Sequence, residues 1–148
     1  MDSFVIRSNM NSVEWVRKPI YTKGDRATHI AIDAIGNTFV GGQYHIGNTM
    51  TWGAVQANCN NGGKGSYVTK ISTAGSVGWA QNYCSTYSSN SYYVTLSSLN
   101  ISDSELMISA DTNSRVRSRG SSSMSDCGNY GNWNMIILMV EGKAWIAL

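Results

Sequence analysis

Side chains that could carry acid–base, nucleophilic or metal chemistry are few in this sequence. The only histidines are His29 and His45, and neither has a cysteine at a spacing that suits zinc. The Gly-x-Ser-x-Gly and His-Glu-x-x-His motifs are absent, and no glycine-rich loop of the phosphate-binding type occurs. A small acidic cluster near one predicted turn comprises Asp103, Glu105 and Asp111. Its carboxylates suit a solvated turn, with a calcium site or glycosidase carboxylates as the alternatives. We expect no enzyme, no cofactor and no metal.

Aromatic side chains in predicted loops are the main candidates for ligand binding. Sugar rings stack on exposed indole and phenol faces, while neighbouring amides supply hydrogen bonds. The alternative interpretation is that these rings cover the edge of the core or an interface. The candidate rings are Tyr44, Trp52, Tyr87, Tyr130 and Trp133, with amides nearby at Gln43, Asn48 and Asn129.

Two further surface features could bind or carry a polar group. Arg115, Arg117 and Arg119 alternate along the chain, so an extended backbone would place their cations on one side. Such a row could bind an acidic polysaccharide, or it could serve as a charged edge that discourages strand addition. Asn100 opens an Asn-x-Ser sequon within a turn predicted over residues 100–104, which makes it a glycosylation candidate.

Composition favours an all-β protein. The net charge of +2 and the charged fraction of 14% provide no basic stripe for nucleic acid. Serine, asparagine, glycine and tyrosine are abundant, and there is a single proline. No long window has apolar residues at helical spacing. The apolar run at residues 135–140 is too short to span a bilayer, so we expect a buried strand and no membrane insertion.

Internal repetition is the most informative pattern. Trp15, Trp79 and Trp145 each follow an apolar strand and a tight turn, and they are 64 and 66 residues apart. Cys59 and Cys127 keep the same phase ahead of the second and third copies. A second type of hairpin, at residues 27–42 and again at 92–110, lies between these tryptophan hairpins. Each period of about 65 residues therefore predicts four antiparallel strands, with the tryptophans packing one sheet on the next.

These strands group into an N-terminal hairpin at residues 3–20, a first four-stranded blade at 24–84 and a second at 92–148. The links at 43–65 and 112–134 are rich in glycine, asparagine and serine, and we expect long loops there. Four-stranded units stacked side by side are typical of β-propellers. We therefore expect an all-β, propeller-like fold of about two blades plus an extra hairpin.

Two segments resemble the bacterial-type seven-bladed β-propeller repeat. They are Ile-Ala-Ile-Asp-Ala-Ile-Gly-Asn-Thr-Phe-Val-Gly-Gly at 30–42 and Tyr-Val-Thr-Lys-Ile-Ser-Thr-Ala-Gly-Ser-Val-Gly-Trp at 67–79. The resemblance covers residues 24–84 well and 92–146 weakly. It implies a propeller-type blade and a secreted or surface-exposed protein, and it supplies no catalytic residues.

The cysteines bear on where the protein resides. Cys84 ends the second tryptophan strand, near the start of that strand's partner, and Cys59 lies a few residues upstream of the partner. We expect a Cys59–Cys84 disulfide, with free buried thiols as the alternative. The equivalent partner of Cys127 would lie past residue 148, so this cysteine is expected to be unpaired or joined between chains. A disulfide predicts an extracellular or cell-surface location.

Two and a half blades leave apolar faces at the ends of the stack. We therefore expect a non-catalytic structural or interaction module that associates with other copies of itself or with neighbouring blades of a longer chain, as a ring or a filament. The alternative is a carbohydrate-binding, lectin-like propeller whose partners are glycans.

Overall fold

The computed structural model describes residues 3–20, 26–45, 49–58, 64–85, 93–102, 105–113, 116–120, 133–140 and 143–147. This part of the chain contains strands and turns, and no helix in it is long and apolar enough to cross a bilayer. All strand pairs are antiparallel, apart from one isolated parallel bridge between Lys64 and Tyr93. The predicted all-β class is confirmed.

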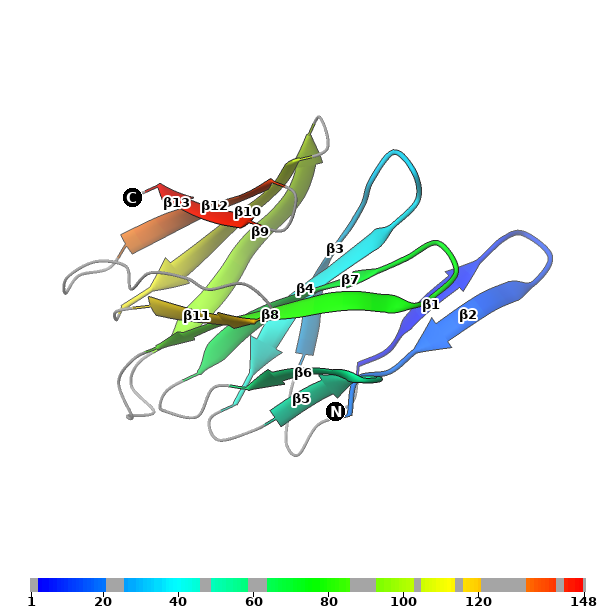
Figure 1. The fold of residues 1–148 in the computed structure, drawn as a ribbon, viewed down its shortest axis with the longest axis horizontal. Helices are drawn as coiled ribbons and strands as arrows, with labels where there is room; N and C mark the ends of the chain where they lie inside the picture. Colours follow the sequence, from blue (N-terminus) through cyan, green and yellow to red (C-terminus); the bar gives the residue numbers. More distant parts are fainter. Residues whose placement is uncertain are drawn as a thin grey trace.

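A five-stranded sheet forms the centre of the molecule (Figure 1). Its strand order is β11-β8-β7-β4-β3, so β3 and β11 are its two edges. Local hydrogen bonds close the turns between these strands. Asp33 Oδ1 accepts from the N–H of Asn37 in the turn before β4, and Ser72 Oγ accepts from the N–H of Ser76 in the turn before β8. The strands are β3 (Arg26–Ile32), β4 (Thr38–Tyr44), β7 (Gly65–Ile71), β8 (Val77–Ser85) and β11 (Val116–Gly120).

A four-stranded sheet lies on one side of the central sheet, and a two-stranded hairpin lies on the other (Figure 1). The four-stranded sheet has the order β13-β12-β10-β9 and comprises β9 (Val94–Ser102), β10 (Glu105–Thr112), β12 (Trp133–Val140) and β13 (Lys143–Ala147). The hairpin consists of β1 (Val5–Ser8) and β2 (Val13–Arg17). A second hairpin, β5 (Thr49–Trp52) and β6 (Val55–Asn58), is joined to the end of the first by a bridge between Ile20 and Thr51.

The expectation of long loops at residues 43–65 and 112–134 is wrong for the parts of these links that the structure describes, while residues 59–63 and 121–132 lie outside them. The first link contains β5 and β6, and the second contains β11, which pairs with the edge of β8. Gly53, with φ +61°, turns the chain between β5 and β6, and Met50 and Trp52 in β5 supply apolar residues that pack on the sheet. The polar composition of these links concealed their short strands from the sequence analysis.

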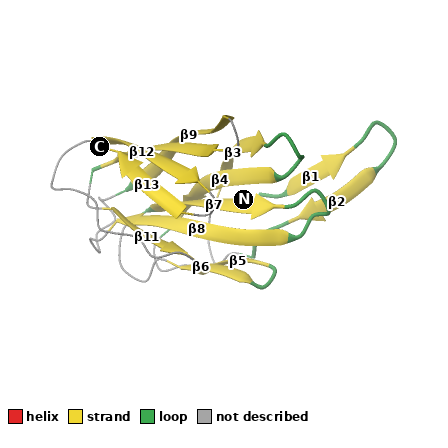
Figure 2. Ribbon diagram, turned by 45° about the horizontal axis from the view of Figure 1, so that its top comes forward, coloured by secondary structure: helices red, strands yellow, loops and turns green. Residues whose placement is uncertain are grey.

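The central sheet is buried on both faces (Figure 2). Consecutive residues alternate between two apolar clusters: Val68 faces β9 and β10, whereas Tyr67 faces the two hairpins. We call the first cluster the β9 core and the second the hairpin core. The β9 core contains Phe39, Val68, Tyr83, Val94, Leu96, Leu99, Leu106, Ile108 and Ala110. The hairpin core contains Val5, Trp15, Val40, Met50, Trp52, Tyr67, Ile71, Ala80 and Cys84.

Close approach between the sheets depends on a glycine. A Cβ atom at Gly41 would overlap Leu96 Cδ2, so only the bare backbone of β4 leaves room for the leucine. The two sheets are also joined by a buried hydrogen bond, in which Ser66 Oγ donates to the carbonyl oxygen of Val94 at 2.7 Å. The fit of Leu96 against Gly41 and the buried hydrogen bond of Ser66 together fix how the four-stranded sheet packs on the central sheet.

Two buried polar side chains in the central sheet differ in their partners. Thr69 Oγ1 donates to the carbonyl oxygen of Trp79 at 2.8 Å. Asn82 is fully buried, and neither its amide nitrogen nor its amide oxygen has a hydrogen-bond partner. A buried polar group without a partner costs about 1–3 kcal/mol, so Asn82 weakens the sheet that it belongs to.

We expect Asn82→Leu to raise the free energy of unfolding by at most about 1–3 kcal/mol, because it removes a desolvated amide while keeping the same branching, and the larger leucine offsets part of this gain. Urea denaturation measures the change. The control, Thr69→Val, removes a hydrogen bond that is made, and it should lower stability by about 0.5–1.5 kcal/mol. A loss of stability in both variants would contradict the assignment of Asn82.

Candidate interaction surface

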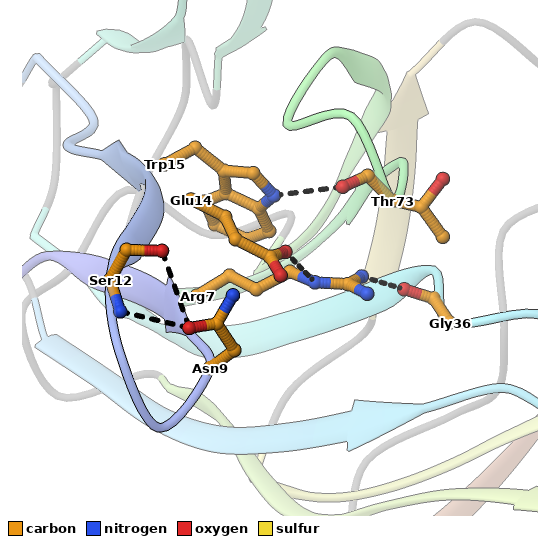
Figure 3. A network of polar contacts seen from close by, with 7 residues as sticks. All are labelled: Arg7, Asn9, Ser12, Glu14, Trp15, Gly36 and Thr73. Atoms are coloured by element: carbon orange, nitrogen blue, oxygen red, sulfur yellow. Dashed lines mark hydrogen bonds and ion pairs between the residues drawn. The ribbon is translucent and has the colours of Figure 1, made fainter.

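The hairpin of β1 and β2 docks on two turns of the central sheet through polar side chains (Figure 3). Arg7 Nη1 donates to the carbonyl oxygen of Gly36 at 2.8 Å, and Trp15 Nε1 donates to that of Thr73 at 3.0 Å. Arg17 Nε donates to the carbonyl oxygen of Gly75. An ion pair between Arg7 Nε and Glu14 Oε2 at 2.7 Å orients the first guanidinium. Three donors of the hairpin therefore satisfy main-chain acceptors in the two turns.

The tip of this hairpin is closed by Asn9. Its Oδ1 atom accepts hydrogen bonds from the backbone N–H groups of Asn11 at 2.9 Å and Ser12 at 2.8 Å, which is the local bonding expected of an asparagine in a tight turn. This turn sets the register that places Trp15 opposite Arg7. The two docking side chains consequently project from the same face of the hairpin.

Trp15 sits directly on the backbone of Gly75. This glycine has φ +82°, and a Cβ atom there would lie 2.8 Å from Trp15 Cγ. A side chain at this position would therefore meet both the left-handed backbone and the indole ring. Gly75 is the point of closest contact between the hairpin and the central sheet.

The opposite face of the hairpin carries apolar side chains that the described residues cover only in part. Ile6 and Val16 face each other across β1 and β2, and both are about half exposed. Phe4, just before β1, is 61% exposed. Val5 and Trp15, which alternate with these residues, are buried in the hairpin core. The hairpin is therefore apolar on both faces although only one is packed.

Strand β3 is also partly uncovered. Ile30 pairs with Val40, so both side chains project from the face of the hairpin core, yet Ile30 is 59% exposed and Val40 is buried. Ile32 on the same face is 64% exposed. A groove of about 290 Å³ separates β1 from β3. Its lining residues are Phe4, Val5, Ile6, Ala27, Thr28, His29, Ile30 and Val40.

The turn after β3 is fixed by Asp33. Its Oδ1 accepts from the backbone N–H of Asn37 at 2.7 Å and of Ile35 at 3.2 Å, and its Oδ2 accepts from Asn37 Nδ2 at 2.7 Å. Desolvation by burial raises the pKa of Asp33, but these hydrogen bonds and the charge of Lys70 outweigh it and leave the pKa below its usual value of 3.8. The ionised carboxylate therefore stabilises the turn.

The aromatic residues predicted to bind sugars are not brought together in the described part of the chain. Trp52 is 1% exposed and packs in the hairpin core, where its Nε1 atom donates to Met50 Sδ at 3.3 Å. A ring this deeply buried has no free face for a sugar, so Trp52 is a core residue. It was misplaced because the loop that was expected to carry it is strand β5. Tyr87 and Tyr130, and the side chains of Tyr44 and Trp133, lie outside the described residues.

The tryptophans predicted to pack sheet on sheet can be compared at two positions. Trp15 points from the hairpin into the hairpin core, and Trp79 points from β8 toward the β9 core, with its ring centroid 6.0 Å from that of Phe39. Each therefore points from its own strand toward the layer formed by later residues. The side chain of Trp145 lies outside the described residues, although its backbone belongs to β13.

The remaining predicted polar sites are spread over the molecule. Arg117 and Arg119 belong to β11, opposite Cys84 and Asn82 of β8, so the backbone of the arginine run is extended at a sheet edge; Arg115 lies outside the described residues. The expected turn at residues 100–104 begins later than predicted, because β9 continues to Ser102. Asn100 is consequently an exposed strand residue. Leu99 and Ile101 alternate with polar neighbours there, a strand pattern that the sequon obscured.

The acidic cluster does not form a metal site in the part of the chain that can be described. Glu105 and Asp111 are exposed on β10, and Asp111 Oδ2 accepts a hydrogen bond from Ser97 Oγ at 2.7 Å. Asp103 lies outside the described residues. Among the described residues, no three histidine, cysteine or acidic side chains lie close enough together to hold a metal ion. His29 Nε2 lies 3.2 Å from the carbonyl oxygen of Ser97, linking β3 to β9.

Cys84 is disulfide-bonded. Its partner is one of the two other cysteines, Cys59 and Cys127, which both lie outside the described residues. The pairing of Cys59 with Cys84 therefore stays a prediction, and so does the unpaired or inter-chain state of Cys127.

Comparison with known proteins adds no identification. No protein-family model matches the chain, and no curated protein and no solved structure matches it significantly. The exposed strands β1 and β3, with the groove between them, are therefore assessed on their own chemistry.

The docking of the hairpin can be tested at Gly75. We expect Gly75→Ala to destabilise the protein by more than the roughly 1–2 kcal/mol of a left-handed alanine, because its Cβ atom also overlaps Trp15. Gly53 is the matched control: its φ is +61° and a Cβ atom there would meet nothing within 4 Å, so Gly53→Ala has the backbone cost alone. Equal losses in urea denaturation of the two variants would mean that the hairpin does not dock on Gly75.

The Asp33 turn makes stability depend on acid pH. Because the folded-state pKa is lowered, the contribution of the carboxylate is present above the unfolded value of 3.8 and is lost as the pH falls through the folded-state pKa. We expect Asp33→Asn to flatten the fall in unfolding free energy measured between about pH 5 and about pH 2.5. Parallel pH curves for the parent chain and the variant would rule out this role for Asp33.

Proposed function

We propose that this chain is a non-catalytic, extracellular structural module whose β-layers associate with other copies of the chain or with neighbouring layers of a longer one. The observation that supports this most is the unsatisfied apolar surface at the hairpin end. Phe4, Ile6 and Val16 line an open sheet face, and Ile30 and Ile32 extend it along β3. Soluble monomers rarely leave contiguous apolar surface of this kind, which is typical of interaction sites.

The same proposal includes a finer view of the fold, in which the layers are successive blades of a propeller-like stack. Three observations support it. The layers follow one another in chain order apart from β11, which comes after β10 and joins the edge of the central sheet. Strands β3, β4, β7 and β8 form a meander, as do β9, β10, β12 and β13, and Trp15 and Trp79 point toward the following layer. On this view the β1–β2 hairpin is half a blade, and the uncovered part of β3 is where the other half would pack.

The disulfide at Cys84 supports the extracellular part of the proposal. Disulfides persist in oxidising compartments and are rare in the cytosol.

The chain also has two full tryptophan-bearing sheets in which charged residues are few, so association through apolar faces meets little electrostatic repulsion.

Carbohydrate binding is less well supported as a function. The one candidate aromatic whose side chain is described, Trp52, is in the core, and the groove between β1 and β3 has Phe4 as its single aromatic lining residue. The groove between β1 and β3 is lined mainly by aliphatic groups, which do not provide the planar stacking surface that sugars use.

Native mass decides the proposal. We expect multi-angle light scattering of the disulfide-intact chain to report assemblies larger than the 16.1 kDa monomer, with a mass that rises with concentration. Apolar association should resist moderate salt, since screening weakens charge pairs and leaves apolar burial intact. A monodisperse 16.1 kDa particle across the concentration range would reject self-association.

A further inference from the structure

The two edges of the central sheet differ in how they are protected. Natural sheets discourage unwanted pairing by placing charged residues or proline on edge strands. Strand β11 has two arginines in five residues. Strand β3 has seven residues, and its only charge is Arg26 at the first position; the remainder, Ala-Thr-His-Ile-Ala-Ile, has no charge and no proline. Within the described residues, no strand pairs with the outer side of β3.

The backbone direction along β3 can be deduced from its turn. The N–H of Asp33 donates to the carbonyl oxygen of Asn37, so Asp33 bonds inward, toward β4. Hydrogen-bonding direction alternates along an antiparallel strand. Ala31 therefore also bonds toward β4, whereas the N–H and C=O groups of Ile30 and Ile32 point away from it. These two residues present both the unpaired backbone groups and the exposed aliphatic side chains.

The first part of this edge is already occupied. Ser3 Oγ accepts a hydrogen bond from the N–H of Ala27 at 2.9 Å, and the register with β4 shifts between Ala27 and His29. The bulge and the Ser3 contact confine any strand addition to the later half of β3. The groove between β1 and β3 runs along the first and middle residues of β3, from Ala27 to Ile30, and Ile32 lies beyond it.

The charges at the two ends of β3 indicate which strand fits. Arg26, at the start, is exposed, and Asp33, directly after the end, has a pKa below 3.8 and is ionised at neutral pH, as an aspartate of ordinary pKa also is. A second β3 running antiparallel and paired through Ile30 and Ala31 places Arg26 of each copy opposite residues 34 to 36 of the other, one to three residues past Asp33, so opposite charges come near each other twice. A parallel arrangement would bring like charges together. The strand is therefore complementary to itself in the antiparallel direction alone.

We propose that β3 pairs antiparallel with β3 of a second copy across a two-fold axis, so that the two central sheets become one continuous sheet. Ile30 and Ile32 of each copy then lie beside those of the other on one face of the continuous sheet, which buries part of the apolar surface that β3 leaves open. This proposal rests on the proposed self-association and identifies one of its contacts. A two-fold pairing of this kind closes on itself, so other faces remain available for further growth.

Substitutions at exposed positions test the pairing without disturbing the core. We expect Ile30→Lys and Ile32→Lys each to raise the dimer dissociation constant about tenfold or more in sedimentation equilibrium, because a charge is buried at the new strand pair. Val13→Lys is the matched control, since Val13 is 59% exposed, as Ile30 is, but lies on β2 outside the groove. Its dissociation constant should stay within about twofold of the parent value.

Cross-linking tests the symmetry. In a non-reducing gel after mild oxidation, a cysteine at the two-fold axis forms a disulfide with its own copy, so either Ile30→Cys or Ala31→Cys should give a covalent dimer beyond the parent background. The control Val13→Cys should add none. Dimers from Val13→Cys, or from none of the three variants, would overturn the β3 pairing.

The outcomes separate the two proposals. If the parent chain is a monomer at all concentrations, the proposed function fails and the β3 pairing with it. If the parent assembles but both lysine variants and Val13→Lys retain its dissociation constant, or if Val13→Lys alone dissociates it, self-association stands and the β3 contact is wrong. Circular dichroism of each variant confirms that the sheet is folded before its mass is interpreted.

Discussion

Burial of the central sheet on both faces is the constraint on which the rest of this structure depends. Alternation along β7 directs Tyr67 and Val68 into different cores, so neither face is polar enough to meet water. One cover is the β9–β10 pair and the other is assembled from two short hairpins. Because every strand of the central sheet must be covered twice, any strand that is covered once exposes apolar side chains. Strand β3 is covered on one face only, and Ile30 and Ile32 are therefore exposed.

Much of the fold could be predicted from the sequence, and the reasons are local. The hairpin predicted at residues 27–42 and the apolar strand and tight turn predicted before Trp79 lie within a few residues of the observed strands and reversals. The periodic tryptophans also marked positions that point into a core, at least for Trp15 and Trp79. These signals depend on neighbours in the chain, which a sequence displays directly.

What the sequence did not predict depends on contacts between distant residues. Strands β5 and β11 lie in polar segments, and they exist because Met50 and Trp52 find an apolar sheet face and because β8 offers a free edge. The interaction surface was missed for the same reason: Ile30 and Ile32 have an ordinary strand pattern, and only the position of the hairpin leaves them uncovered. The one signal that pointed to it was the lack of charge along β3 compared with the arginines of β11.

The way in which the hairpin is held has a consequence for how this protein tolerates change. Its three acceptors are the carbonyl oxygens of Gly36, Thr73 and Gly75, which belong to the main chain. The side chain of Thr73 takes no part in that hydrogen bond, so a substitution of Thr73 can leave the hydrogen bond to Trp15 intact. The donors have no such freedom, since Arg7, Trp15 and Arg17 each contribute a nitrogen that other residue types would not place there. Sequence constraint at this joint therefore falls on the three donors and on Gly36 and Gly75, where the positive φ and the lack of space exclude a Cβ atom, while the identity of Thr73 matters least.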